Sequence, residues 1–285
     1  MHLWIVMVIV SGILLGFWDV TKKKAFEKNS VVTVLTFYSL FCFLLVSFEF
    51  SNAVNIYLDK IFIIFIKTFV VFIAWVLSFS AIKHLPISVI TPFDTLNPMF
   101  SIIFGIVILS ERLSSFQYIG IIIMLISYYF IGKVGSKEVI KIFNNKYFYF
   151  MLGSALLNAV SATIDKIALK SINPGQMQFW FTFFMFLFNA STLAYLRVRG
   201  KEKNSIKLDL YIPLMSVLLI ISDRLYFTAV NIPSSQISII MPLRKISIFI
   251  SVIVGGLIFK EKNLKRKFSY ICFLILGIVF LFIKK

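Results

Sequence analysis

Long apolar runs, separated by short polar joints, follow one another along almost the whole chain. A helix of about twenty apolar residues crosses a hydrocarbon core of about 30 Å. In lipid a helix satisfies its own backbone hydrogen bonds, and these runs lack the alternation of a barrel strand. The pattern therefore predicts an all-α membrane protein with ten transmembrane helices. We expect these helices at residues 3–23, 31–49, 61–82, 86–109, 115–132, 147–169, 175–196, 209–231, 234–258 and 267–283.

Pro92, Pro98 and Pro242 lie inside predicted helices. A proline in a helix interior removes one backbone hydrogen bond and clashes with the preceding turn. Each of the three is therefore expected to kink its helix.

Two features of the sequence recur at one spacing. Pro92 and Pro242 are 150 residues apart (242 − 92 = 150), and so are Glu111 and Glu261 (261 − 111 = 150). Recurrence at a fixed spacing indicates an internal repeat. Because each copy holds five helices, an odd number, the second copy must enter the membrane from the opposite side, as in inverted repeats. The expected parts are a first five-helix repeat at 1–134, a linker at 135–146 and a second five-helix repeat at 147–285.

The joint between the fourth and fifth predicted helices carries a family resemblance. Residues 109–120 read Leu-Ser-Glu-Arg-Leu-Ser-Ser-Phe-Gln-Tyr-Ile-Gly, and residues 81–86 and Pro92 precede them. On these residues the chain resembles the EamA-like transporters of the drug/metabolite transporter superfamily, along essentially its whole length. The second copy departs from the family pattern at Lys267 and Tyr270, where Gln and Gly are expected. The resemblance implies a secondary carrier that works by alternating access, often an exporter of amino acids or related metabolites.

Composition and charge narrow the class of protein further. Hydrophobic residues make up 60% of the chain and charged residues 14%, which excludes an ordinary water-soluble domain. The net charge of +17 comes from Lys and Arg in the joints, where such residues set membrane orientation and contact anionic lipid. We therefore expect the lipid bilayer, and no nucleic acid, as a partner. The basic joints place both termini outside the cytoplasm, whereas the family resemblance implies the reverse.

A pair of ionisable residues near helix centres is the main candidate for a substrate site. Asp94 and Arg244 occupy equivalent positions of the two copies (244 − 94 = 150), and Asn97 and Ser247 follow one turn later. Ionisable groups within a membrane usually face the bundle interior, and inverted repeats place their substrate sites near the midplane. An Arg suits a carboxylate and an Asp suits an amine, so the pair would suit a zwitterion. The alternative is a salt bridge that only holds the two halves together.

Other polar and aromatic residues of the predicted helices join this hypothesis. Of the adjacent pair Asp223 and Arg224, one is expected to line the cavity and the other to find a partner, because neighbours on a helix point about 100° apart. The residues expected to bind substrate are Asp94, Asn97, Arg244, Ser247, Asp223, Tyr226 and Trp75. A carboxyl group at low dielectric can also couple transport to protons, and the candidates are Asp94, Asp165 and Asp19. For Asp165 and Asp19, which lie nearer helix ends, the alternative is a plain interfacial role.

The function expected from the sequence is secondary transport of a small polar metabolite, an amino acid or a related zwitterion, in the direction of export. The alternatives are a flippase for lipids or lipid-linked molecules and a membrane protein that transports nothing. A membrane enzyme is disfavoured, because the only histidines are His2 and His84 and no catalytic motif accompanies them. We expect no cofactor and no metal, protons as the coupling ion, a monomer or homodimer, and the cell membrane of a prokaryote.

Overall fold

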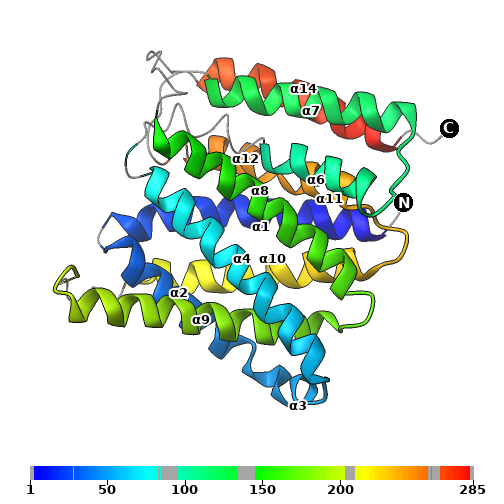
Figure 1. The fold of residues 1–285 in the computed structure, drawn as a ribbon. Coiled ribbons are helices and arrows are strands. Elements are labelled where there is room, and N and C mark those ends of the chain that lie inside the picture. The colour runs from blue at the N-terminus through cyan, green and yellow to red at the C-terminus, as the bar shows by residue number, and fades with distance from the viewer. Residues whose placement is uncertain are drawn as a thin grey trace. The chain divides into compact units, whose positions relative to one another are not determined.

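The computed structural model describes residues 3–27, 29–82, 84, 96–133, 145–202, 209–255, 258 and 264–282. Every regular element within these residues is a helix (Figure 1). The helices are Leu3–Phe26 (α1), Val31–Leu45 (α2), Ser47–Glu49 (η1), Phe50–Ala53 (α3), Leu58–Ile82 (α4), Leu96–Val107 (α6), Ser115–Lys133 (α7), Lys146–Ala168 (α8), Pro174–Val198 (α9), Tyr211–Asn231 (α10), Ile237–Arg244 (α11), Ser247–Ile250 (α12), Ser251–Gly255 (η3) and Leu264–Phe282 (α14). Each predicted apolar run overlaps at least one of them.

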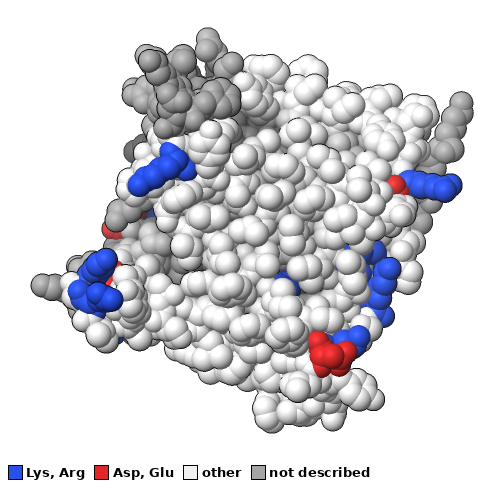
Figure 2. Space-filling view, in the orientation of Figure 1, with Lys and Arg blue, Asp and Glu red and all other residues white. Residues whose placement is uncertain are grey.

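Within the described residues, five helices are long and apolar enough to cross a membrane, namely α1, α4, α8, α9 and α10. The bent pair formed by α2 and the following η1 and α3 makes a sixth if it counts as one span. Ten spans are therefore not seen in this part of the chain. On the face drawn in Figure 2, charged side chains form a few small groups and most of the surface is uncharged, as a lipid-covered surface requires.

The second predicted helix, 31–49, does not run straight to its end. The α-helix ends at Leu45, and the next helical segment leaves at an angle of 46°. The Val46 N–H is shared between the carbonyls of Cys42 and Phe43, at 3.3 and 3.2 Å, and Glu49 N–H donates to Val46 O at 3.0 Å. The hydrogen-bond ladder thus tightens from four-residue to three-residue spacing, which is the usual way in which a helix changes into a 3₁₀ turn.

The ninth predicted helix, 234–258, is broken as well, but not at the proline. Pro242 lies inside α11, and the helix ends two residues later at Arg244. Three-residue hydrogen bonds follow, from Lys245 N–H to Pro242 O at 3.1 Å and from Ile246 N–H to Leu243 O at 3.0 Å. A short α-helix and a π-helical turn continue the chain, so the proline is followed by a break rather than by a simple kink.

The other two prolines are not tested in this way. Pro98 lies near the start of α6, and residues 85–95, which precede that helix, lie outside the described residues. The predicted kink at Pro98 therefore stays a prediction. Pro92 lies outside the described residues.

The chain packs into two compact units. Unit 1 comprises residues 1–72 and 165–233, and unit 2 comprises residues 73–164 and 234–285. Each unit combines segments from both predicted repeats, so the division by packing is separate from the division by sequence. The described charged clusters discussed below lie in unit 1.

In unit 1, α1 runs beside α10, and α2 lies against α9 and α10 (Figure 1). Small side chains lie where α1 meets α10. The hydroxyls of Ser11 and Ser222 hydrogen-bond to each other across this contact at 2.9 Å. Asn189 on α9 donates to the Ser39 hydroxyl on α2 at 3.4 Å. Such contacts between buried polar side chains are typical of helix pairs in membranes.

In unit 2, α7 and α14 lie side by side (Figure 1). Gly120 and Gly277 face each other there, and a Cβ atom on Gly120 would lie 2.6 Å from the carbonyl oxygen of Gly277. The same unit contains α6 against α11. Glu111, in the joint after α6, accepts hydrogen bonds from the backbone N–H groups of Ile237 and Ser238 at 2.6 and 2.9 Å.

Candidate functional site

A sealed ion pair between Lys67 on α4 and Asp165 on α8 is the central feature of unit 1. The ammonium Nζ lies 3.2 Å from Oδ1 of the carboxylate, and the two side chains are only 3% and 4% exposed. Removing two charges from water costs several kcal/mol per ion, which a pair recovers only in part. In membrane proteins, buried ionisable groups of this kind usually mark substrate or ion pathways.

Aromatic side chains complete the surroundings of this ion pair. The hydroxyl of Tyr226 on α10 donates to Oδ2 of Asp165 at 3.2 Å. Nζ of Lys67 lies 3.7 Å from the centre of the Phe181 ring and 4.8 Å from that of Phe227. Both distances are within the range of attraction between a cation and an aromatic face. We call Asp165, Phe181 and Phe227, which contact the ammonium, together with Tyr226, which donates to Asp165, the ammonium cage.

A second carboxyl group lies near the cage. Asp223 precedes Tyr226 by one turn of α10 and is buried. Asp223, like Asp165, belongs to unit 1.

Lys166, the residue after Asp165, has a different role. Its Nζ donates to the carbonyls of Val230 and Ile232, at 3.0 and 3.1 Å. These carbonyls belong to the end of α10, where the last carbonyls of a helix need partners and the helix dipole favours a cation. Lys166 is thus a buried cap for the end of α10, whereas its neighbour Asp165 belongs to the cage.

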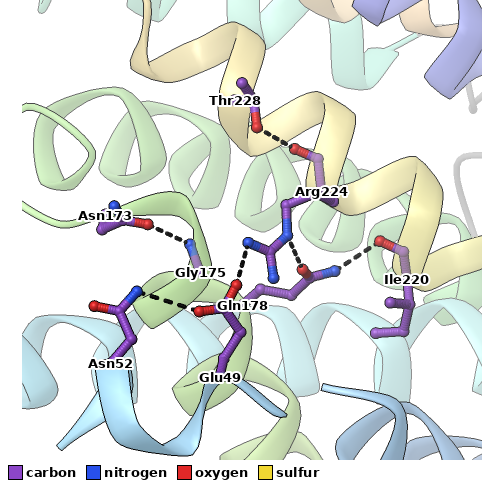
Figure 3. A network of polar contacts seen from close by, with 8 residues as sticks. All are labelled: Glu49, Asn52, Asn173, Gly175, Gln178, Ile220, Arg224 and Thr228. Carbon is purple, nitrogen blue, oxygen red and sulfur yellow. Dashed lines mark hydrogen bonds and ion pairs between the residues drawn. The ribbon is translucent and has the colours of Figure 1, made fainter. Parts of the chain in front are cut away.

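A second polar cluster, shown in Figure 3, joins the start of α9 to η1 and α10. Arg224 on α10 donates through Nη1 to Glu49 at 2.7 Å and through Nε to Gln178 at 2.7 Å. Gln178 in turn donates to the carbonyl of Ile220 at 2.7 Å. The guanidinium is therefore held at two corners by two different elements.

The Glu49 carboxylate lies against the first turn of α9. A Cβ atom on Gly175 would lie 2.7 to 2.8 Å from all three atoms of the Glu49 carboxyl group, so a larger residue there would require the carboxyl group to move (Figure 3). Asn52 donates to the same carboxylate at 3.2 Å, and Asn173 caps α9 in a capping box with Gln176. The negative charge thus lies where the helix dipole favours it.

The structure brings three of the predicted site residues together. Asp223 and Tyr226, expected to bind substrate, lie in unit 1 with Asp165, expected to couple transport to protons. Asp165 is buried, and both its coupling role and the alternative of a plain interfacial role stay predictions. Asp19, also in unit 1, forms a salt bridge of 2.8 Å with Lys22 and its side chain is 37% exposed.

The remaining predicted residues are not part of the cage. Trp75 stacks edge-on against Phe79 at 6.4 Å, and Asn97 accepts hydrogen bonds from the Ser101 hydroxyl at 2.9 and 3.3 Å. Arg244 ends α11 and is half-buried, and Ser247 begins α12 and is buried. These four belong to unit 2. Asp94 lies outside the described residues.

Sequence reasoning missed Lys67, Glu49 and Gln178. Lys67 could have been found, because it is the tenth residue of a 25-residue apolar helix and a lysine at that depth needs a partner. Glu49 is the last residue of the predicted helix 31–49, where a charged residue is common and needs no special partner. Gln178 is an uncharged residue whose importance depends on Arg224, which is distant in the sequence.

Within the described part of the chain, no group of three or more His, Cys, Asp or Glu side chains could hold a metal ion. The cage and the Arg224 cluster offer ion pairing, cation–aromatic contact and hydrogen bonding. Interactions of these kinds hold polar and charged groups in proteins.

Three comparisons relate the chain to known proteins. A model of the EamA-like transporter family matches the sequence twice, over residues 2–133 and 145–283. A solved structure, described only as the crystal structure of a protein, matches with a TM-score of 0.75 at 11% identity, over 98% of this chain and 94% of that one. At this identity the likeness concerns the fold alone. No curated protein matches the sequence.

Proposed function

The chain belongs to the EamA-like transporter family, and from that premise we propose that it is a secondary transporter for a small polar metabolite. The family implies a multi-pass integral membrane protein that moves small molecules and is not an enzyme. The proposal adds the polar character of the solute, alternating access as the mechanism, and export as the direction. It places the protein in the cell membrane of a prokaryote.

The observation that carries this proposal is the buried ion pair of Lys67 and Asp165 with the Tyr226 hydroxyl. A membrane helix bundle whose only task is to pack could fill this space with apolar side chains, often with equal or greater stability. Charges retained in such a place are accounted for by a solute or an ion that must be recognised there. An apolar cargo would not need them.

We also propose the arrangement of the whole chain as ten transmembrane helices in two inverted five-helix repeats. The double match to one family model supports this arrangement. In it, Asp94 and Arg244 would lie near the midplane, with Asn97, Ser247 and Trp75 beside them as further substrate contacts. Protons are the proposed coupling ion, with Asp94, Asp165 and Asp19 as the carriers. One chain would enclose the site, and a homodimer would place two such sites side by side.

The test compares metabolites inside cells and in their medium. Cells would express the wild type, Asp94→Asn, Arg244→Gln or Lys67→Met at matched protein levels. We expect one or a few polar solutes to leave cells that make the wild type and to stay in cells that make the variants. Lys60→Met is the matched control, because the Lys60 side chain is 28% exposed and forms only a loose contact of 3.7 Å with Asp59.

Two results would count against the proposal. If the variants fold and export the solute as the wild type does, the charges are structural and the substrate site lies elsewhere. If the wild type moves no polar solute in any of the cells tested but moves a fluorescent lipid between leaflets of proteoliposomes, the protein is a lipid flippase.

A further inference from the structure

We propose that the ammonium cage is a binding site for a primary ammonium group, and that Lys67 is its resident ligand, which an ammonium-bearing cargo displaces. The displacement step rests on the transporter function proposed above. The site itself is argued from the contacts of unit 1 alone.

The cage offers the contacts that any alkylammonium group requires. Asp165 provides the counter-charge at 3.2 Å from Nζ, and Phe181 and Phe227 provide two ring faces at 3.7 and 4.8 Å. Carboxylate and aromatic faces together are the usual means of recognising an organic cation in a dry site. None of these contacts depends on the ammonium being attached to α4.

The Asp165 carboxylate leaves room for a closer ligand than Lys67. Oδ1 lies 3.2 Å from Nζ of Lys67, which is longer than the distance of about 2.7–2.9 Å that is usual for an ammonium–carboxylate hydrogen bond. The other oxygen, Oδ2, accepts the Tyr226 hydroxyl. An ammonium that is not attached to α4 can approach Oδ1 more closely and align an N–H with it.

A resident lysine also resolves a difficulty of any such site. A buried carboxylate without a counter-charge is strongly destabilising. Lys67 keeps Asp165 compensated while no cargo is bound. When a cargo ammonium takes its place, the charge of the cage is unchanged and the lysine side chain is released.

The proposal is tested on the purified full-length chain in detergent by thermal unfolding. Lys67→Ala removes the propylammonium part of the side chain, so n-propylammonium is the probe, and n-propanol is the neutral probe of the same shape. We expect n-propylammonium to raise the unfolding temperature of Lys67→Ala, because it refills the cage and compensates Asp165. The matched control is the double variant Lys67→Ala/Asp165→Asn, which has the same space without the carboxylate and should not respond.

The wild type decides whether Lys67 can be displaced. Because Lys67 competes for the cage, n-propylammonium should also stabilise the wild type, with an apparent affinity roughly tenfold or more weaker than in Lys67→Ala. Asp165→Asn should abolish this response. If Lys67→Ala does not survive purification without ligand, the yield of monodisperse protein extracted with and without n-propylammonium gives the same comparison.

Three results would overturn the proposal. An equal effect of n-propanol would mean that the probe only fills a void. A response of the double variant would place the amine elsewhere. A response of Lys67→Ala with none in the wild type, at about a hundred times the concentration that saturates the variant, would make Lys67 a fixed structural partner. Since unfolding is measured without transport, the cage can be supported while the transporter proposal fails, and the reverse is also true.

Discussion

At the scale of single residues, the buried Lys67–Asp165 pair makes a prediction about stability. Lys67→Met leaves Asp165 as a buried carboxylate without its counter-charge, which costs about 3–5 kcal/mol in comparable cases. We expect the double variant Lys67→Met/Asp165→Asn to recover most of that loss, because neither charge then remains. The measurement is the free energy of unfolding in detergent for all four members of the cycle, which isolates the coupling between the two residues.

Lys60→Met is the control for this cycle, since the Lys60 ammonium is partly exposed and its loss should change stability by less than about 0.5 kcal/mol. Additive losses in the double variant would contradict the prediction. They would mean that each side chain stabilises the unit through contacts other than the ion pair.

Gly175 offers a second test at this scale. An added Cβ would collide with the Glu49 carboxyl group at 2.7 to 2.8 Å, so Gly175→Ala should push Glu49 away from Arg224 and the start of α9. We expect a loss of about 1–3 kcal/mol, because a buried charged group then loses a partner. In the Glu49→Ala background the same change should be neutral or stabilising, since alanine is the better helix former. Thermal unfolding of the two single variants and the double variant checks this, and equal effects of Gly175→Ala in both backgrounds would refute it.

How much of the site the sequence could predict depends on the type of residue. Asp165, Asp223 and Tyr226 were predicted because charged or hydrogen-bonding side chains within apolar membrane helices usually face the bundle interior and need polar partners. The same reasoning applies to Lys67, a charged residue within an apolar helix that the sequence alone could have identified. The bond between Glu49 and Arg224 joins residues 175 positions apart, a distance over which one sequence carries no pairing information.

At the scale of elements, the segment that carries the family resemblance turns out to be a helix junction. Ser110 adopts a left-handed backbone with φ of 54°, and Glu111 N–H returns to the carbonyl of Gly105 at 3.0 Å. This turn aims the Glu111 carboxylate at the first N–H groups of α11. The motif therefore specifies how two helices of unit 2 meet, which is why it indicates the fold and is silent on the solute.

A substitution at Glu111 tests that role. Glu111→Ala removes the acceptor for the N–H groups of Ile237 and Ser238, and loss of such a cap costs about 0.5–2 kcal/mol. We expect faster amide hydrogen exchange at the start of α11, because that helix has eight residues and few other hydrogen bonds to hold its first turn. Glu27→Ala removes an exposed carboxylate paired with Lys24 and should leave α11 unchanged. Unchanged exchange at α11 in Glu111→Ala would show that other contacts hold its first turn.

Hydropathy located the helices but not their breaks. The apolar run continues across Val46, so composition gave no reason to divide it there, whereas Arg244 and Lys245 stand directly before the break at Ile246. Pro242 did indicate a disturbance, yet the helix continues for two residues beyond it. Where a run bends depends on the partners of the freed backbone groups, and these belong to the tertiary structure.

At the scale of the whole molecule, the inverted repeat makes a prediction about sides of the membrane. If five helices precede the linker at 135–146, a reporter at the N-terminus and one inserted in that linker must lie on opposite sides. We expect a pair of reporters, one active only in the cytoplasm and one only outside it, to give opposite results at the two positions. A second insertion between residues 202 and 209 should agree with the linker, because two helices separate the two sites. Equal results at the N-terminus and the linker would rule out five spans in the first copy.

The ion pair at the centre of unit 1 also constrains how this lineage can change. A chain that loses Lys67 or Asp165 alone passes through an intermediate with a stranded buried charge, about 3–5 kcal/mol less stable, and a protein of ordinary stability cannot spare much of that. The two residues are therefore expected to be inherited together. Among its descendants, lysine and aspartate should be found together at these positions or replaced together by apolar side chains, and a chain that keeps one without the other should carry a new counter-charge within the cage.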